Sequence, residues 1–288
     1  MTVLRAVFLS VGMVVLSTVC VAIQWTLFKL GRPSSRTFPM RYHRMICGLI
    51  GLRVNLRGAI SDKRPLLLVS NHVSWLDISV IGSLIPLSFI AKKEVATWPV
   101  FGLFARLQRS VFIDRERKRG AREANQALAE RLKAGEVMVL FAEGTSSDGN
   151  RVLPFKSAIL GAAEQAVRES HLDEVAVQPM AIAYTHRYGL QIGRTERPFY
   201  AWYGDMDLLP HIWGVLKHGP IDVSVALGPV HATADFANRK ALTRSLEGEV
   251  RRMFAAEVYG AATPLPAETA ASSGAKQDPP PAYRAGGA

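Results

Sequence analysis

Hydrophobic positions form one long run near the start of the chain and shorter runs after it. The first run covers residues 6–28 and is interrupted only by Gly, Ser, Thr and Gln24. At ~1.5 Å per residue its 23 residues reach across a bilayer core of ~30 Å, so an N-terminal membrane-anchoring helix is expected, either spanning the bilayer or lying in its interface. A cleaved signal peptide is the competing interpretation, but the run is long for one and no clear small-x-small site precedes Lys29.

Beyond this run, the sequence alternates between stretches with helical spacing of apolar residues and short apolar runs. Residues 39–51 have the spacing of an amphipathic helix that either floats on a membrane surface or packs on the domain. Later stretches with helical spacing are Arg122–Lys133, Lys156–Val167 and Asp235–Val258. The short apolar runs predict strands at Arg53–Arg57, Leu66–Ser70, Ser88–Ala91, Ser110–Ile113, Val137–Phe141, Val175–Tyr184 and Ile221–Leu227.

Strands that alternate with helices predict an α/β fold with a mostly parallel or mixed central sheet flanked by helices. The domain boundaries expected from these patterns are an anchor at residues 1–36 and the α/β domain at residues 37–259. Residues 260–288 are rich in Ala, Pro, Ser and Gly and cannot bury a core, so they are expected to form a disordered tail.

Charge narrows the choice of partners. The formal net charge is +11, and residues 1–61 hold eight basic residues and no acidic one. Such a surface suits nucleic acid or an anionic membrane, and the neighbouring apolar run favours the membrane, so nucleic acid is not expected. The basic residues after the apolar run place the body of the protein on the cytoplasmic side of a bacterial inner membrane. Cys20 and Cys47 are too few for a disulfide framework or a cysteine-rich metal site and are expected to be buried.

Candidate chemistry follows the second predicted strand, where His72 and Asp77 stand five residues apart in and after a polar loop. An aspartate near the second ring nitrogen would fix the histidine tautomer and stabilise the imidazolium. A histidine and an aspartate at this spacing are weak support on their own, and the other six histidines show no partner pattern. A second polar loop, beginning with Glu143 and Gly144, follows the strand at Val137–Phe141.

Three rival classes remain open at this point. A serine hydrolase lacks the Gly-x-Ser-x-Gly elbow, and Ser74 is better interpreted as the N-cap of the helix that follows it. A metal hydrolase would have to use His72, Asp77 and Glu143, which make a thin ligand set, so no metal is expected. A non-enzymatic membrane scaffold would not need His72 at all.

Four ordered motifs together are more specific. Asn71-His72-x4-Asp77, Phe112-Ile113-Asp114-Arg115, Phe141-Ala142-Glu143-Gly144-Thr145 and Val177-Gln178-Pro179-Met180 resemble those of the glycerolipid acyltransferases, of which 1-acyl-sn-glycerol-3-phosphate acyltransferase is the best-known type. The resemblance covers roughly residues 52–227. It implies direct transfer of a fatty acyl group from an acyl carrier protein or coenzyme A thioester to a lysolipid hydroxyl, with neither a further cofactor nor a metal.

The resemblance also implies roles for single residues. His72 takes the proton of the acceptor hydroxyl, and Asp77 holds and charge-balances its imidazole. The substrate-binding set carried over by the motifs is Arg115, Glu143, Gly144, Thr145, Ser146 and Lys156.

One departure from the family pattern concerns the acceptor. Members that bind lysophosphatidic acid usually carry an arginine where this chain has Ser146, and arginine suits a phosphate. The run from Glu143 to Ser157 and the string Trp202-Tyr203-Gly204-Asp205-Met206 resemble the branch that acylates lyso-ornithine lipid, whose zwitterionic head group Asp148 or Asp205 would contact. Lysophosphatidic acid stays as the alternative acceptor, because Arg115 or Arg151 can replace the missing arginine.

Overall fold

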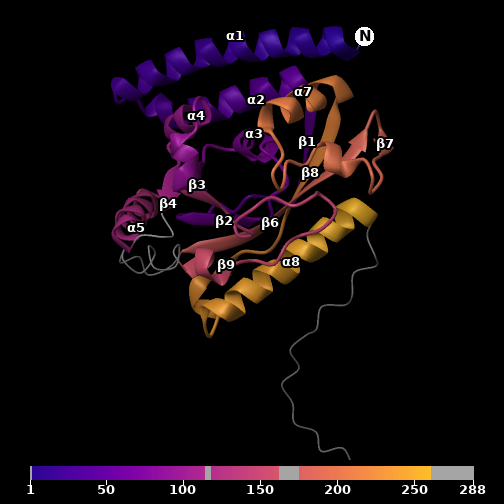
Figure 1. The fold of residues 1–288 in the computed structure, drawn as a ribbon. Helices are drawn as coiled ribbons and strands as arrows, with labels where there is room; N and C mark the ends of the chain where they lie inside the picture. The colour runs from indigo at the N-terminus through magenta and orange to yellow at the C-terminus, as the bar shows by residue number, and fades with distance from the viewer. Residues whose placement is uncertain (1, 114–117, 162–174, 261–288) are drawn as a thin grey trace, which may run out of the picture.

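The computed structural model describes residues 2–113, 118–161 and 175–260 (Figure 1). The predicted contact Arg115, most of the predicted helix Lys156–Val167 and the predicted tail beyond residue 260 lie outside these ranges. Within them, residues 157–161 are helical, as predicted.

One mixed sheet organises the described residues. Its strand order is β1-β8-β6-β2-β5-β3-β4, with β7 and β9 also paired to β6. All neighbours from β6 to β4 run parallel, as do β1 and β8, whereas β6 is antiparallel to β7, β8 and β9. The strands are β1 (Leu52–Arg57), β2 (Leu66–Ser70), β3 (Ser88–Lys92), β4 (Val111–Ile113), β5 (Val137–Phe141), β6 (Ala176–Arg187), β7 (Leu190–Gln191), β8 (Ile221–Leu227) and β9 (His231–Ala232).

Helices cover both faces of this sheet, which confirms the predicted α/β fold (Figure 1). One core cluster packs α5 and α8 against the sheet, and the other packs α1, α2, α3 and α7 against it. The helices are α1 (Thr2–Lys29), α2 (Phe38–Ile50), α3 (Leu76–Gly82), α4 (Phe101–Leu107), α5 (Lys118–Lys133), α7 (Leu208–His218) and α8 (Arg239–Tyr259). Short 3₁₀ turns are η1 (Pro33–Arg36), η2 (Lys93–Thr97), η3 (Arg197–Phe199) and η4 (Thr233–Asp235).

The central strand β2 is buried along its whole length because β5 and β6 pair with its two edges and helices cover both faces. Its four apolar side chains, Leu66 to Val69, are at most 4% exposed. Burying one such side chain contributes about 1.5–3 kcal/mol. The carboxyl end of β2 is therefore a rigid point from which to hold a functional loop.

Helix α1 lies along the domain rather than standing away from it (Figure 1). Near its start, Arg5 donates to the carbonyl groups of Leu216 and Ile50. Near its end, the amide of Gln24 donates to the carbonyl oxygens of Ser35 at 2.8 Å and Leu107 at 2.9 Å. These polar contacts fasten α1 at both ends to α2, α4 and α7.

Candidate active site

His72 and Asp77 are brought together where β2 ends and α3 begins. The imidazole Nδ1 lies 2.8 Å from Oδ2 of Asp77. The same carboxylate oxygen accepts the backbone N–H of Val73 at 2.7 Å and of Ser74 at 3.0 Å, and Oδ1 accepts the hydroxyl of Tyr184 at 2.7 Å. Asp77 is fully buried, so these four donors hold its carboxylate in one orientation.

The prediction that Ser74 caps α3 is wrong. The helix begins at Leu76, the N-cap residue is Trp75, and no side chain caps it. Instead Asp77, in the first turn, reaches back to the backbone N–H groups of Val73 and Ser74. The Ser74 hydroxyl is fully buried and has no hydrogen-bond partner within the described residues, so it is not accessible as a nucleophile.

The imidazole of His72 is presented on its other side. Its ring stacks on Phe141, with 4.1 Å between ring centroids and 19° between planes. Because Asp77 accepts a hydrogen bond at Nδ1, the neutral ring carries its proton there, and Nε2 is left with a lone pair. Nε2 makes no hydrogen bond to the described part of the chain, and the side chain is 20% exposed. This arrangement suits a general base.

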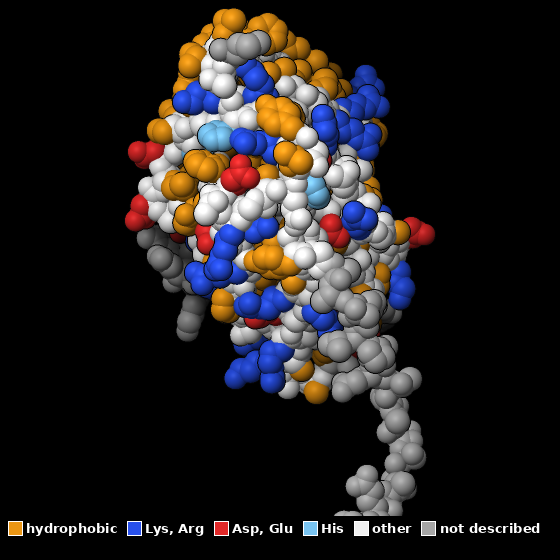
Figure 2. Space-filling view, turned by 90° about the vertical axis from the view of Figure 1, so that its right-hand side faces the viewer, with side chains coloured by type: hydrophobic (Ala, Val, Ile, Leu, Met, Phe, Trp, Pro, Cys, Tyr) orange, Lys and Arg blue, Asp and Glu red, His pale blue; other side chains and the backbone are white. Residues whose placement is uncertain are grey.

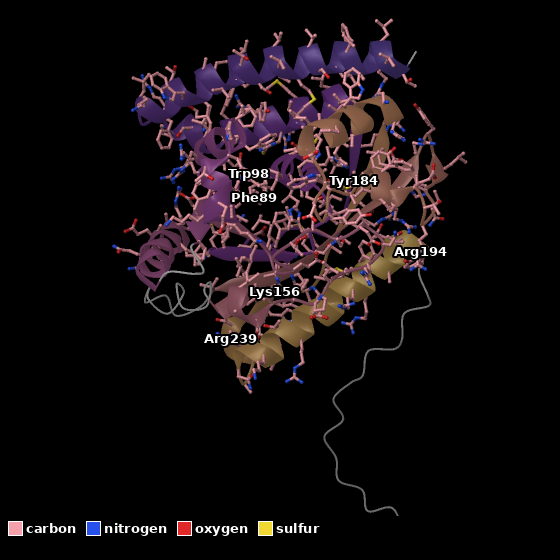
Figure 3. The ribbon with its side chains drawn as sticks, in the orientation of Figure 1. Phe89, Trp98, Lys156, Tyr184, Arg194 and Arg239 are labelled. Atoms are coloured by element: carbon pink, nitrogen blue, oxygen red, sulfur yellow. The ribbon has the colours of Figure 1, made fainter. Side chains whose placement is uncertain are left out.

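A cavity of about 630 Å³ opens beside His72. Its walls come from α1, α2, α3, β3, η2, α4, α7 and the loops after β5 and η3. Phe89 and Trp98, two of its lining residues, lie close together in Figure 3, on the side of the sheet toward α4. Most lining side chains are apolar, so the cavity is suited to a hydrocarbon chain.

Two polar residues that line the cavity, His43 and Gln108, are hydrogen-bonded to each other. His43 is buried, with Nε2 2.9 Å from Oε1 of Gln108. The amide nitrogen of Gln108 donates to Leu87 O at 3.1 Å, so its oxygen accepts and His43 Nε2 is the donor. Burial lowers the pKa of His43 to about 4, which keeps it neutral. His43 therefore holds α2 against the segment after α4 rather than acting as a second base.

The loop after β5 also contributes to the cavity wall. Gly144 has φ of +70°, a conformation that favours glycine, and lets the chain turn directly after the strand. Gly144, Thr145 and Ser146 all line the cavity, and their role in binding substrate stays a prediction. The hydroxyl of Ser146 donates to the carbonyl oxygen of Trp202, which ties this loop to the segment after η3.

Glu143 lies below the loop rather than in the cavity. Its side chain is fully buried, with Oε2 accepting the N–H of His72 at 3.3 Å and Oε1 accepting the N–H of Leu153 at 2.9 Å. Burial raises the pKa of Glu143 to about 8, although both backbone donors lower it. The predicted role of Glu143 as a direct acceptor contact therefore needs correction, because its carboxyl group joins the two active-site loops.

Other predicted contacts lie away from the cavity. Lys156 is exposed, does not line the cavity and lies nearer to α8 than to Trp98 and Phe89 (Figure 3). Asp148, whose carboxylate accepts the N–H of Asn150, and Asp205 do not line it either. These contacts were predicted from their position in the sequence, and the folded loops do not place the three side chains in the cavity wall.

No group of three or more His, Cys, Asp and Glu side chains suited to a metal occurs among residues 2–113, 118–161 and 175–260. The suggested set of His72, Asp77 and Glu143 does not converge. The oxygens of Asp77 are taken up by the imidazole, two backbone N–H groups and Tyr184, and those of Glu143 by two backbone N–H groups.

Two residues of the site were not predicted from sequence. Tyr184, at the far end of β6, reaches Asp77 across 107 positions in the chain. Asn71 exchanges two hydrogen bonds with the backbone of Ile182, Oδ1 at 2.8 Å and Nδ2 at 3.0 Å, so its amide continues the pairing of β2 with β6 beyond the strand. Only the position of Tyr184 in a predicted strand hinted at its placement.

Comparisons with known proteins agree with this geometry. A family model described as Acyltransferase matches residues 52–183, which include the whole of the His72 and Glu143 loops. A lyso-ornithine lipid O-acyltransferase of Brucella abortus (strain 2308) is 47% identical over 262 residues, which are 91% of this chain and 98% of that protein. A lyso-ornithine lipid O-acyltransferase of Rhizobium meliloti (strain 1021) is 41% identical over 281 residues, 98% of this chain and 93% of that protein.

A solved structure shares the fold. The 1-acyl-sn-glycerophosphate (LPA) acyltransferase of Thermotoga maritima matches 88% of this chain and 96% of its own, with a TM-score of 0.61 and 22% identity. The similarity of sequence, which extends over nearly the whole of the relatives, establishes the family that the site geometry indicates. The chain belongs to the acyltransferase family and is an enzyme of the acyltransferase class.

Proposed function

We propose that this enzyme moves a fatty acyl group from an acyl carrier protein or coenzyme A thioester to the free hydroxyl of lyso-ornithine lipid, giving ornithine lipid. The observation that carries the proposal is the His72–Asp77 pair, which presents an unbonded Nε2 at an apolar cavity of about 630 Å³. A cavity of this kind accommodates acyl chains, and the histidine at its mouth meets the group that has to lose a proton.

The two ring nitrogens of His72 have separate roles in the proposed reaction. His72 Nε2 takes the proton of the acceptor hydroxyl as its oxygen attacks the thioester carbonyl carbon, and the imidazolium that forms is stabilised by the Asp77 carboxylate 2.8 Å from Nδ1. The tetrahedral intermediate then collapses, the carbon–sulfur bond breaks, and His72 returns the proton to the thiolate. A thioester is already activated, so the reaction does not require a resident cofactor or metal.

Ser146 and the names of the relatives both favour lyso-ornithine lipid as the acceptor. Ser146 donates to the backbone of Trp202 and adds no positive charge to the mouth, so a phosphate group gains no partner there. The relatives at 47% and 41% identity both carry the name lyso-ornithine lipid O-acyltransferase. Lysophosphatidic acid is the second candidate, because the Thermotoga maritima protein of the same fold is named for it.

A parallel transfer assay tests the proposal. Purified enzyme is offered lyso-ornithine lipid and lysophosphatidic acid in separate reactions, each with acyl carrier protein and coenzyme A thioesters of one chain length. Acylated product from lyso-ornithine lipid, with little from lysophosphatidic acid, is expected. Product from lysophosphatidic acid alone would make this a phosphatidic acid-forming enzyme. The faster of the two thioesters identifies the donor.

Ser146→Arg is expected to shift acceptor preference toward lysophosphatidic acid. The guanidinium adds charged donors at the cavity mouth, and a hydrogen bond to a charged group contributes about 1.5–3 kcal/mol, which corresponds to a change of about tenfold or more. The measurement is the ratio of kcat/KM for the two acceptors, and Ser146→Met is the uncharged control. An unchanged ratio in Ser146→Arg would remove Ser146 from the acceptor argument.

Tyr184→Phe is expected to lower kcat about tenfold without unfolding the protein, because one oxygen of the buried Asp77 carboxylate loses its donor. Without this donor the carboxylate is oriented less firmly toward Nδ1 and stabilises the imidazolium less, so the acid limb of the kcat/KM profile moves to lower pH. Tyr200→Phe is the control, since that ring stacks on Tyr184 with centroids 6.1 Å apart but is not bonded to Asp77. A fall in kcat without movement of the limb would limit Tyr184 to packing.

We also propose that the enzyme works at the cytoplasmic face of a bacterial inner membrane. Within the described residues α1 is the one helix long and apolar enough to cross a membrane, but it is fastened along the domain. Its outer side exposes large apolar side chains, which gather at the top of Figure 2 with Lys and Arg side chains below them. Lys29, Arg32, Arg36, Arg41 and Arg44 are all exposed. This pattern favours a helix that lies in the interface over one that spans.

Cysteine labelling separates the two placements of α1. Cysteines introduced at Thr2, the first residue of the helix, and at Ser34, beyond its end, are expected to react with a membrane-impermeant reagent from the same, cytoplasmic side. The two natural cysteines are buried, so background labelling is expected to be low. Labelling of the two positions from opposite sides would mean that α1 spans the bilayer.

A further inference from the structure

An aromatic wall stands at the mouth of the cavity beside the catalytic histidine. Trp98, directly after η2, and Trp202, in the segment after η3, meet edge to face with ring centroids 5.9 Å apart and 86° between planes. Both rings line the cavity, together with the neighbouring Tyr203. Residues from two distant parts of the chain thus place three electron-rich rings at one opening.

Trp202 is held firmly in this wall. Its backbone N–H donates to Val73 O at 2.9 Å, directly beside His72, and its indole N–H donates to Met206 O at 2.8 Å. Its carbonyl oxygen accepts the Ser146 hydroxyl. The ring is therefore fixed relative to the catalytic loop and to the loop after β5 at the same time.

Trp98 is the accessible partner of the pair. Its side chain is 39% exposed, and its indole makes no hydrogen bond to any residue that the structure describes. Trp98 can therefore be replaced without breaking the network that holds the catalytic loop.

A single acid accompanies these rings. Among the described residues that line the cavity, Glu94 is the only carboxylate and Lys92 the only lysine or arginine. Both side chains are exposed. Within the described ranges, neither the carboxylate of Glu94 nor the ammonium group of Lys92 forms an ion pair. Glu94 belongs to η2, four residues before Trp98, so its charge lies in the same segment as the aromatic wall.

We propose that Trp98, Trp202, Tyr203 and Glu94 form a binding site for the side-chain ammonium group of an amino acid head group. Aromatic faces attract an ammonium ion, and a carboxylate at the same opening complements its charge. The ammonium group of Lys92, on β3, attracts the carboxylate of the head group and repels its ammonium group. The two charged groups of the head group are therefore held at different places along the wall. The inference rests on the proposed function and adds to it the residues that recognise the acceptor.

The site favours a ligand whose head group carries a positive charge. A phosphate head group would bring negative charge to the carboxylate of Glu94 and to the electron-rich faces of the rings, which is unfavourable. A head group with a free primary amine gains there instead. Recognition of the amine thus discriminates between the two acceptor classes without a direct contact to the reacting hydroxyl.

The experiment compares two acceptors that differ only in this amine. Purified full-length enzyme is assayed in mixed micelles with lyso-ornithine lipid and with the same lipid whose side-chain amine is acetylated, using one thioester donor. The variants are Trp98→Leu and Glu94→Gln, and the control is Phe199→Leu, an exposed aromatic residue that does not line the cavity. Thermal unfolding of each variant checks that the fold is retained.

The expected result is a rise in KM for lyso-ornithine lipid of about 3- to 30-fold in Trp98→Leu and Glu94→Gln, with kcat changed less than about twofold. The acetylated acceptor should already have a raised KM in the wild type, and the two variants should leave that value unchanged. Phe199→Leu should match the wild type with both acceptors.

Two results would overturn the inference while leaving the proposed function intact. Equal KM values for the two acceptors in the wild type would show that the amine is not recognised. A parallel rise in KM for both acceptors in Trp98→Leu would assign Trp98 to the acyl chain or the membrane. A wild type that does not acylate lyso-ornithine lipid at all would refute the proposed function, and the inference with it.

Discussion

His72→Gln is expected to lower acyl transfer by about 10² to 10⁴, because it removes the group that takes the proton of the acceptor hydroxyl in the proposed reaction. Glutamine has a similar length and polarity and leaves the apolar cavity unchanged. The side chain of His72 is partly exposed and makes its hydrogen bond through Nδ1, so the substitution should cost little folding stability. The measurement is the initial rate of labelled product formation with both substrates saturating.

His186→Gln is the matched control for this prediction. His186 lies on β6 at the hairpin with β7 and does not line the cavity, so its replacement should leave the rate unchanged. Unfolding temperatures of both variants should lie close to that of the wild type. A His72→Gln enzyme that keeps a tenth or more of the wild-type rate would show that another group removes the proton.

Asp77→Asn is expected to reduce kcat by a factor of the order of 10⁴, the size of the loss when the aspartate of a serine protease triad is replaced by asparagine. An asparagine oxygen can still accept the N–H groups of Val73 and Ser74, so the turn into α3 should form. The substitution removes the negative charge 2.8 Å from Nδ1, which stabilises the imidazolium in the proposed reaction. The measurement is kcat at saturating acceptor together with acceptor KM.

The control for Asp77→Asn is Asp222→Asn, which removes a carboxylate 3.8 Å from an exposed arginine, Arg53, on the sheet edge. That pair should contribute little to stability or rate. If Asp77→Asn raises the acceptor KM but leaves kcat near the wild-type value, Asp77 orients the loop for binding and does not assist proton transfer.

Much of the sheet could be predicted from sequence because its strands are short, largely apolar runs. Leu66–Ser70, Val137–Phe141 and Ile221–Leu227 form strands with the predicted bounds. The sixth strand extends three residues past its predicted end at Tyr184, because Thr185 to Arg187 belong to a hairpin and pair with β7 and β8. Such pairing depends on where the chain returns, which periodicity does not reveal.

The placement of α1 was less predictable. The run at residues 6–28 is apolar almost all round, so the sequence did not indicate which side faces the protein. Polar residues in the run and just before it determine which side faces the domain, since Arg5, Ser17 and Gln24 all bond to the domain. A polar residue in an apolar helix was a usable signal, but its partners come from distant segments.

Part of the candidate site could be predicted from the sequence, and part depends on the fold. His72 and Asp77 lie five positions apart in one loop, so their meeting could be predicted locally. Tyr184 and the pair of Trp98 and Trp202 enter the site only through the order of the strands and loops around the sheet. Glu143 was correctly found at a strand end, but only the fold shows that its carboxyl group faces two backbone N–H groups instead of the cavity.

A trapping experiment tests whether the acyl group passes directly from the thioester to the hydroxyl. Enzyme in molar excess is mixed with radiolabelled acyl donor without acceptor, quenched in acid and analysed for covalently bound label, and the reaction is repeated with lyso-ornithine lipid present. Unlabelled protein is expected in the first reaction and labelled lipid in the second, because Ser74 is fully buried and the hydroxyl of Ser146, which lines the cavity, is bonded to the carbonyl oxygen of Trp202. Protein labelled in proportion to active sites, with label that passes to the lipid when acceptor is added, would contradict direct transfer.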